Sequence, residues 1–114
     1  MFKAFLFIFM ALIVSGCNPK AVGSATDELT LYYIDKKIYD PTICQAKEID
    51  GSYYVLCHPS GDKNSGGLYK IEHNDSDKYV IRPINGKAIQ HVGSDFGSSL
   101  KDSNINIGKI IESF

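Results

Sequence analysis

The apolar residues of this chain of 114 residues form one dense N-terminal block and several short segments separated by polar turns. The block covers residues 4–14 without interruption, and Lys3 is the charge that precedes it. It is much shorter than the roughly 20 apolar residues that a membrane-spanning helix needs. A basic residue followed by a short apolar run is typical of an export signal. We therefore expect residues 1–16 to be a signal peptide.

The clearest hairpin pattern surrounds Asp50-Gly51, a favoured two-residue type I′ turn, with residues 42–49 and 52–58 as its strands. Such a turn pairs Ile49 with Ser52 and, five residues further along each strand, Cys44 with Cys57. That pair is a non-hydrogen-bonded one, with Cα atoms about 4.5 Å apart, a separation that a disulfide accepts. Turn chemistry and cysteine spacing together predict a Cys44–Cys57 disulfide.

Three more segments read as strands. Residues 68–73 form the first, after a loop of composition SGDKNSGG. Residues 78–84 and 87–92 flank Asn85-Gly86, which is the strongest short hairpin signal. The sequence therefore predicts a second hairpin in which Pro83 faces Ala88, on a pair that needs no N–H from proline.

The remaining segments are less decisive. Residues 17–26 are small and polar and predict a flexible tether. Residues 27–40 fit a helix with Thr26 as N-cap, although a strand is also compatible, and we favour the helix. Residues 104–114 fit either a strand or a helix. The fold class expected is mainly β or α+β: one small antiparallel domain, residues 27–114, with one disulfide and one short N-terminal helix.

Charge and size narrow the function classes. Without residues 1–16, 98 residues remain, and they carry 13 acidic side chains against 11 basic ones because Lys3 is lost. Lysine and arginine are not clustered, so we expect no nucleic-acid partner. A chain of this size forms a single small domain with a thin core, which a disulfide helps to stabilise.

The segment Val14-Ser15-Gly16-Cys17 resembles the lipobox of bacterial lipoproteins. The resemblance implies cleavage between Gly16 and Cys17 and acylation of Cys17, including palmitate on its sulfur, so that the lipid bilayer is a partner through the acyl chains. Two or more chains anchor a protein firmly. Asn18, rather than aspartate, after the cysteine implies the outer membrane, facing the periplasm. Cys44 and Cys57 then form an even pair in an oxidising compartment.

Candidate chemistry is sparse. Asp62 and Asn64 sit at the offsets of a calcium loop, but Gly66 replaces a ligand and His73 stands where a bidentate glutamate is needed. A solvated turn is the alternative interpretation. Residues 58–62 contain histidine, serine and aspartate, yet five neighbours in an extended segment do not converge as a triad must. We expect no enzyme activity, cofactor or bound metal.

Tyrosine is enriched in the cores of protein interfaces, although core packing is the expected use of most of the seven tyrosines. Tyr54 lies on a second strand face, which forms either another packed layer or a partner site. Ser65-Gly66-Gly67-Leu68-Tyr69 resembles a short motif of lysozyme-inhibiting envelope lipoproteins, which implies binding roles for Ser65 and Tyr69. We expect a lipid-anchored envelope module that binds another protein. The alternatives are an inhibitor of lysozyme or another periplasmic hydrolase, and a structural component of an envelope or secretion complex.

Overall fold

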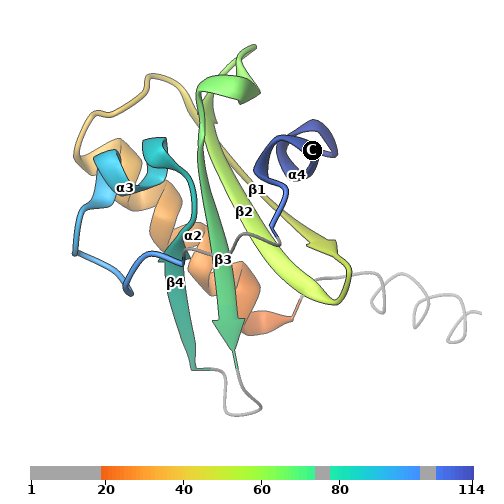
Figure 1. The fold of residues 1–114 in the computed structure, drawn as a ribbon. Coiled ribbons are helices and arrows are strands. Elements are labelled where there is room, and N and C mark those ends of the chain that lie inside the picture. The colour runs from red at the N-terminus through yellow and green to blue at the C-terminus, as the bar shows by residue number, and fades with distance from the viewer. Residues whose placement is uncertain (1–18, 74–77, 101–104) are drawn as a thin grey trace, which may run out of the picture.

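A long helix lies across one face of a four-stranded antiparallel sheet in the computed structural model, which describes residues 19–73, 78–100 and 105–114 (Figure 1). The sheet has the order β1-β2-β3-β4, so each strand pairs with the next one along the chain. The elements are α2 (Lys20–Asp35), β1 (Thr42–Ile49), β2 (Ser52–Pro59), the 3₁₀ turn η1 (Lys63–Ser65), β3 (Gly67–His73), β4 (Tyr79–Pro83), α3 (Gly86–Val92) and α4 (Ile107–Glu112). The domain is an α+β fold.

The first hairpin is confirmed in its turn, register and disulfide. Asp50 and Gly51 both adopt positive φ, 52° and 82°, as a type I′ turn requires. Cys44 pairs with Cys57 across the strands, with Cα atoms 4.1 Å apart, and their sulfur atoms are bonded. The disulfide therefore lies where turn chemistry and cysteine spacing predict it.

The sheet is covered on both faces. On one face α2 buries Val22, Ala25, Leu29 and Tyr33 against all four strands. On the other face the short helix α4 packs Ile110 and Ile111 over a second cluster. The strand residues of that cluster are Tyr54, Leu56 and Leu68, and Ile84 joins it from the segment after β4. Because alternate residues of a strand point to opposite faces, β2 supplies both layers.

The second predicted hairpin is wrong. Residues 86–92 form the helix α3, and Pro83 pairs with Tyr69 of β3 instead of facing Ala88. Asn85 is the N-cap of α3, and its side chain accepts a hydrogen bond from the Ala88 N–H at 2.9 Å. Asparagine favours both turns and helix N-caps, and here tertiary packing of the helical face selects the cap.

The helix in the 27–40 region is longer and earlier than the sequence predicts. It starts at Lys20, within the predicted tether, and Thr26 lies inside it with its hydroxyl donating to the Val22 carbonyl at 2.8 Å. The buried face of Ala21, Val22, Ala25 and Leu29 stabilises these early turns, so a mobile tether over residues 20–26 is wrong. At the C-terminus the helix alternative holds, because Asn106 caps α4 by accepting from Lys109 N–H.

The predicted signal peptide and the predicted acylation site at Cys17 lie outside the described residues. Within residues 19–73, 78–100 and 105–114, every helix is too short or too polar to cross a bilayer.

Candidate binding surface

A cluster of three tyrosines and one histidine joins α2 to the rest of the domain. Tyr33 projects from the buried face of α2, Tyr69 from β3, His91 from α3, and Tyr39 from the loop after α2. The Tyr33 hydroxyl lies 2.5 Å from the Tyr69 hydroxyl and 2.8 Å from His91 Nδ1. The Tyr39 hydroxyl donates to the Ser65 carbonyl at 2.6 Å and lies 3.5 Å from His91 Nε2. We call these four residues the tyrosine–histidine cluster.

One proton arrangement satisfies the whole cluster. Because Tyr39 donates its only proton to Ser65, its oxygen can only accept from the N–H at His91 Nε2. Nδ1 of the neutral ring then accepts from Tyr33, whose oxygen accepts from Tyr69. Protonation of His91 would place a second N–H against Tyr33 and reverse this chain, leaving the buried Tyr69 proton without an acceptor in the cluster. The geometry therefore holds His91 neutral.

The electrostatics of the cluster agree with this arrangement. Burial is the largest cause of the raised pKa of both Tyr33 and Tyr69, and each pKa lies well above the usual value of 10.0. Burial also lowers the pKa of His91, with a smaller contribution from the positive charge of Lys87. The cluster is therefore uncharged at neutral pH, and its hydrogen bonds support the second half of α2 against β3 and α3.

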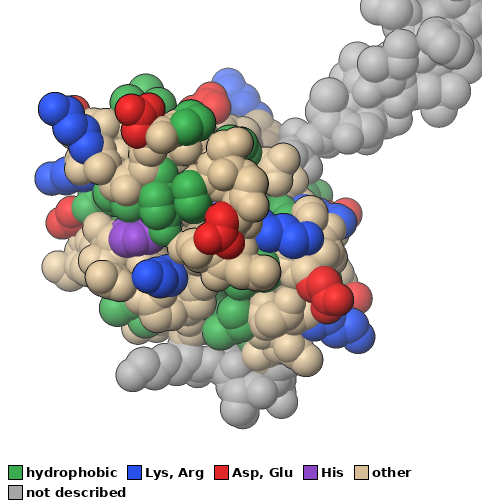
Figure 2. Space-filling model, turned by 90° about the horizontal axis from the view of Figure 1, so that it is seen from above, with side chains coloured by type: hydrophobic (Ala, Val, Ile, Leu, Met, Phe, Trp, Pro, Cys, Tyr) green, Lys and Arg blue, Asp and Glu red, His purple; other side chains and the backbone are tan. Residues whose placement is uncertain are grey.

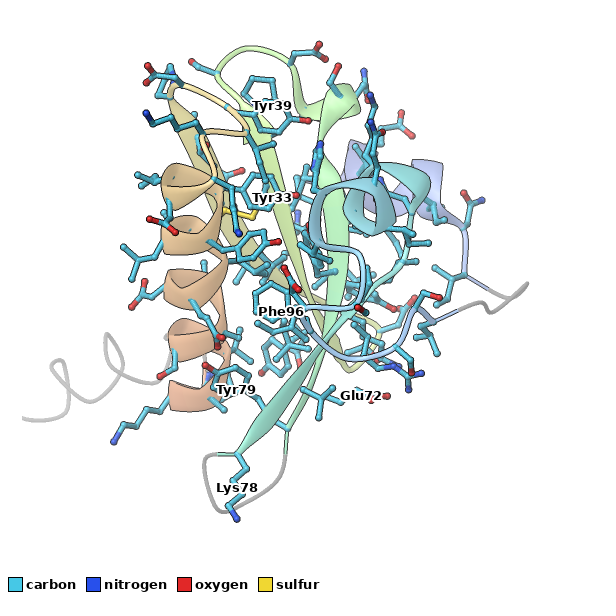
Figure 3. The ribbon with its side chains drawn as sticks, turned by 90° about the vertical axis from the view of Figure 1, so that its left-hand side faces the viewer. Tyr33, Tyr39, Glu72, Lys78, Tyr79 and Phe96 are labelled. Carbon is cyan, nitrogen blue, oxygen red and sulfur yellow. A yellow bond between two sulfur atoms is a disulfide. The ribbon has the colours of Figure 1, made fainter. Side chains whose placement is uncertain are left out.

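Next to this support, α2 and the loop after α3 form an open groove of about 650 Å³. Its base is the half-buried Tyr32, whose ring lies 5.1 Å from that of Phe96, centroid to centroid. The Tyr32 hydroxyl donates to Asp95 Oδ2 at 2.6 Å, and this hydrogen bond raises the pKa of Tyr32 to about 12. In Figure 3, Phe96 lies beside α2, and Tyr33 lies higher along the same helix.

The rim of the groove exposes apolar side chains on the outer face of α2. Leu31 is 66% exposed and Ile34 is 55% exposed, the two highest values among the large apolar residues that the structure describes. The groove is also lined by three carboxylates, Glu28, Asp35 and Asp95, and by one basic side chain, Lys36. An apolar rim within an acidic border is a surface suited to binding rather than to packing within the domain.

The residues singled out from the sequence as binding candidates lie elsewhere. Tyr69 is fully buried in the tyrosine–histidine cluster, and Tyr54 is buried beneath α4, so Tyr54 belongs to a second packed layer. Ser65 is half-buried, and its carbonyl holds Tyr39. The structure therefore does not bring Ser65 and Tyr69 together on an exposed surface, as a direct inhibitory contact would require.

The calcium candidates lie on the loop that contains η1. The Asp62 carboxylate accepts a hydrogen bond from Ser65 Oγ at 2.6 Å, and Asn64 is exposed. Across the described part of the chain, no three histidine, cysteine, aspartate or glutamate side chains come together as metal ligands. The loop geometry is that of a turn closed by its own side chains.

Sequence reasoning missed both the tyrosine–histidine cluster and the groove. Tyr33 and His91 are 58 residues apart, and Phe96 lies in a Gly/Ser-rich segment without a regular pattern. The adjacent tyrosines Tyr32 and Tyr33 were the available signal, because neighbouring residues of a helix point in different directions. One points into the cluster and the other forms the groove.

The neutral state of His91 predicts a pH dependence of stability. An unfolded histidine has a pKa of about 6.5, whereas the folded value is lowered, so the unfolded chain binds more protons between the two values. The free energy of unfolding should therefore be at its full value above about pH 6.5 and fall as the pH drops through that window. Thermal unfolding followed by circular dichroism measures this. In His91→Gln this part of the decline should disappear, and an unchanged decline would contradict the assignment.

Comparison of the chain with models of protein families, with characterised proteins and with solved structures finds no match.

Proposed function

We propose that this protein is a lipid-anchored lipoprotein of the cell envelope whose domain binds a protein partner through the α2 groove and performs no catalysis. The observation that carries the proposal is the exposure of Leu31 and Ile34 beside Tyr32 and Phe96. The anchor is supported by the lipobox-like segment ending at Cys17. Acylation there would hold the domain on the outer membrane, facing the periplasm.

The side chains that line the groove indicate what kind of partner segment it would bind. Apolar side chains at its rim bind apolar side chains of a partner, and the border has three carboxylates against one lysine. Complementary charge favours correct partners and speeds their encounter. The partner segment is therefore an amphipathic one that carries lysine or arginine next to its apolar residues. Because Tyr69 is fully buried, the motif at residues 65–69 does not support a role as an inhibitor of lysozyme.

Site-specific photo-cross-linking in intact envelopes tests this proposal. A photoreactive amino acid in place of Ile34 should form a protein adduct whose cross-linked peptide, read by mass spectrometry, contains basic and apolar residues. The matched control places it at Ile89, which is 37% exposed on α3 and outside the groove. Equal adducts at both positions, an acidic peptide, or a lipid adduct at position 34 would each contradict the proposal.

A further inference from the structure

The sheet register and α2 divide the domain into two ends. Tyr53 pairs with Ile71, and His73 pairs with Tyr79, so the β1–β2 turn, the end of β3 and the start of β4 lie at one end. The Tyr79 hydroxyl donates to Glu28 Oε1 at 2.5 Å, beside the middle of α2, and the later Tyr33 meets Tyr69 towards the start of β3, so α2 begins at that same end (Figure 3). We call it the near end; it carries Lys20 and Lys78, and Figure 3 shows Lys78 at its tip.

The far end is formed by η1, the loop after α2 and the start of α3. The Tyr39 hydroxyl joins the loop after α2 to Ser65, and the Asn85 side chain donates to the Gly66 carbonyl at 3.0 Å. Viewed onto this end, basic and acidic side chains are interspersed (Figure 2). Lys87 is an exposed lysine at the start of α3.

The connection between Cys17 and the domain is very short. Three residue steps separate Cys17 from Lys20, the first residue of α2, and a fully extended chain spans at most about 3.5 Å per step, or about 11 Å. Helix α2 itself has 16 residues and is therefore about 24 Å long. An acylated Cys17 would thus hold the near end at the bilayer, since the connection is less than half the length of the helix.

Charge distinguishes an upright domain from one that lies on its side. The outer face of α2 exposes Asp27, Glu28 and Asp35, which an anionic lipid surface would repel. The near end is not basic by comparison, because the exposed Lys20 and Lys78 stand against the exposed Glu48 and Asp50, Glu72 is paired with Arg82 at 3.2 Å, and the sequence adds Asp75 and Asp77 between β3 and β4. The orientation therefore rests on the short connection, and charge contributes only by disfavouring the outer face of α2 as the side that lies on the bilayer.

We propose that the near end rests on the phospholipid surface and that α2 points away from the bilayer. This inference depends on the proposed acylation of Cys17. Leu31 follows Lys20 by eleven residues, which places it about 16 Å along α2 from the membrane end. The groove is then held clear of the headgroups, where a periplasmic partner reaches it.

Lipid-attached spin labels test the orientation by fluorescence quenching. The acylated protein is placed in vesicles of phosphatidylethanolamine and phosphatidylglycerol, with a fluorophore on Lys78→Cys or on Lys87→Cys. Both lysines are exposed, one at each end, and Cys44 and Cys57 are already bonded to each other. Quenching should be several-fold stronger at position 78. Equal quenching, or stronger quenching at position 87, would overturn the orientation.

Two controls separate the orientation from the anchor. A flexible insertion between Asn18 and Pro19 should remove the difference between positions 78 and 87, and a difference that persists would overturn the role of the short connection. Cys17→Ser should stay in solution while keeping its fold, and mass spectrometry of the wild type should show the acyl chains. A wild type without acyl chains, or a Cys17→Ser protein that still binds membranes, would instead refute the anchor.

Discussion

The substitution Gly67→Ala should lower the free energy of unfolding by about 3 kcal/mol, because it places a methyl group inside the tyrosine–histidine cluster. A Cβ at Gly67 would lie 2.5 Å from the Tyr33 hydroxyl, 3.1 Å from the Tyr69 hydroxyl and 3.1 Å from the Ala88 Cα. The Ala88 backbone is fixed in α3, so the tyrosines must move. Overpacking of a core costs about 1–3 kcal/mol, and an unsatisfied buried hydroxyl costs a similar amount.

Denaturant unfolding measures this effect, and Gly23→Ala is its matched control. A Cβ at Gly23 meets no atom within 4 Å, and the residue is exposed within α2. Alanine is the better helix former, so Gly23→Ala should raise the free energy of unfolding by up to about 1 kcal/mol. If Gly67→Ala were as stable as the wild type, the close packing of Tyr33 and Tyr69 against β3 would be wrong.

The same substitution links stability to the groove. Tyr32 and Tyr33 are neighbours on α2, so a displaced Tyr33 would shift the helix that carries Leu31 and Ile34. We therefore expect the adduct at position 34 to weaken in Gly67→Ala under conditions where the protein remains folded. A cluster that only fills the core, without positioning α2, would leave that adduct unchanged.

What the sequence predicts well is local in origin. The register of β1 and β2 follows from two turn residues and a pair of cysteines, all between positions 44 and 57, and the structure reproduces every pair from Ile49–Ser52 to Cys44–Cys57. The second face of β2 follows from strand alternation alone, which places Tyr54 opposite Tyr53. Predicting that α4 covers this face would have required knowing that residues 107–112 form a helix.

What the sequence predicts poorly depends on contacts between distant segments. Asn85-Gly86 is compatible with a hairpin turn and with a helix start, and burial of Ala88 and Val92 selects the helix. Lys20 to Thr26 are polar enough to suggest a tether, yet three of them are buried against the sheet. The groove requires Phe96 to meet Tyr32 across 63 intervening positions, and no local pattern encodes that contact.

The double substitution Cys44→Ala/Cys57→Ala should lower the free energy of unfolding by about 3 kcal/mol, the chain-entropy estimate for a loop of this size. The bond closes a loop across 13 positions and lies beneath α2, with Cys57 fully buried. Small domains depend on such constraints, because their cores are thin. The loss should appear as a lower denaturant midpoint.

Reduction of the wild type separates the contribution of the loop constraint from the contribution of the packed sulfur atoms. Reduced wild-type protein keeps both sulfur atoms in the core and loses only the loop constraint, whereas the double alanine variant also loses their packing. The reduced protein should therefore be less stable than the oxidised one but at least as stable as the variant. A reduced protein as stable as the oxidised one would show that the constraint contributes nothing. A large gap between the reduced protein and the variant would assign the effect to packing of Cys57 against α2 instead.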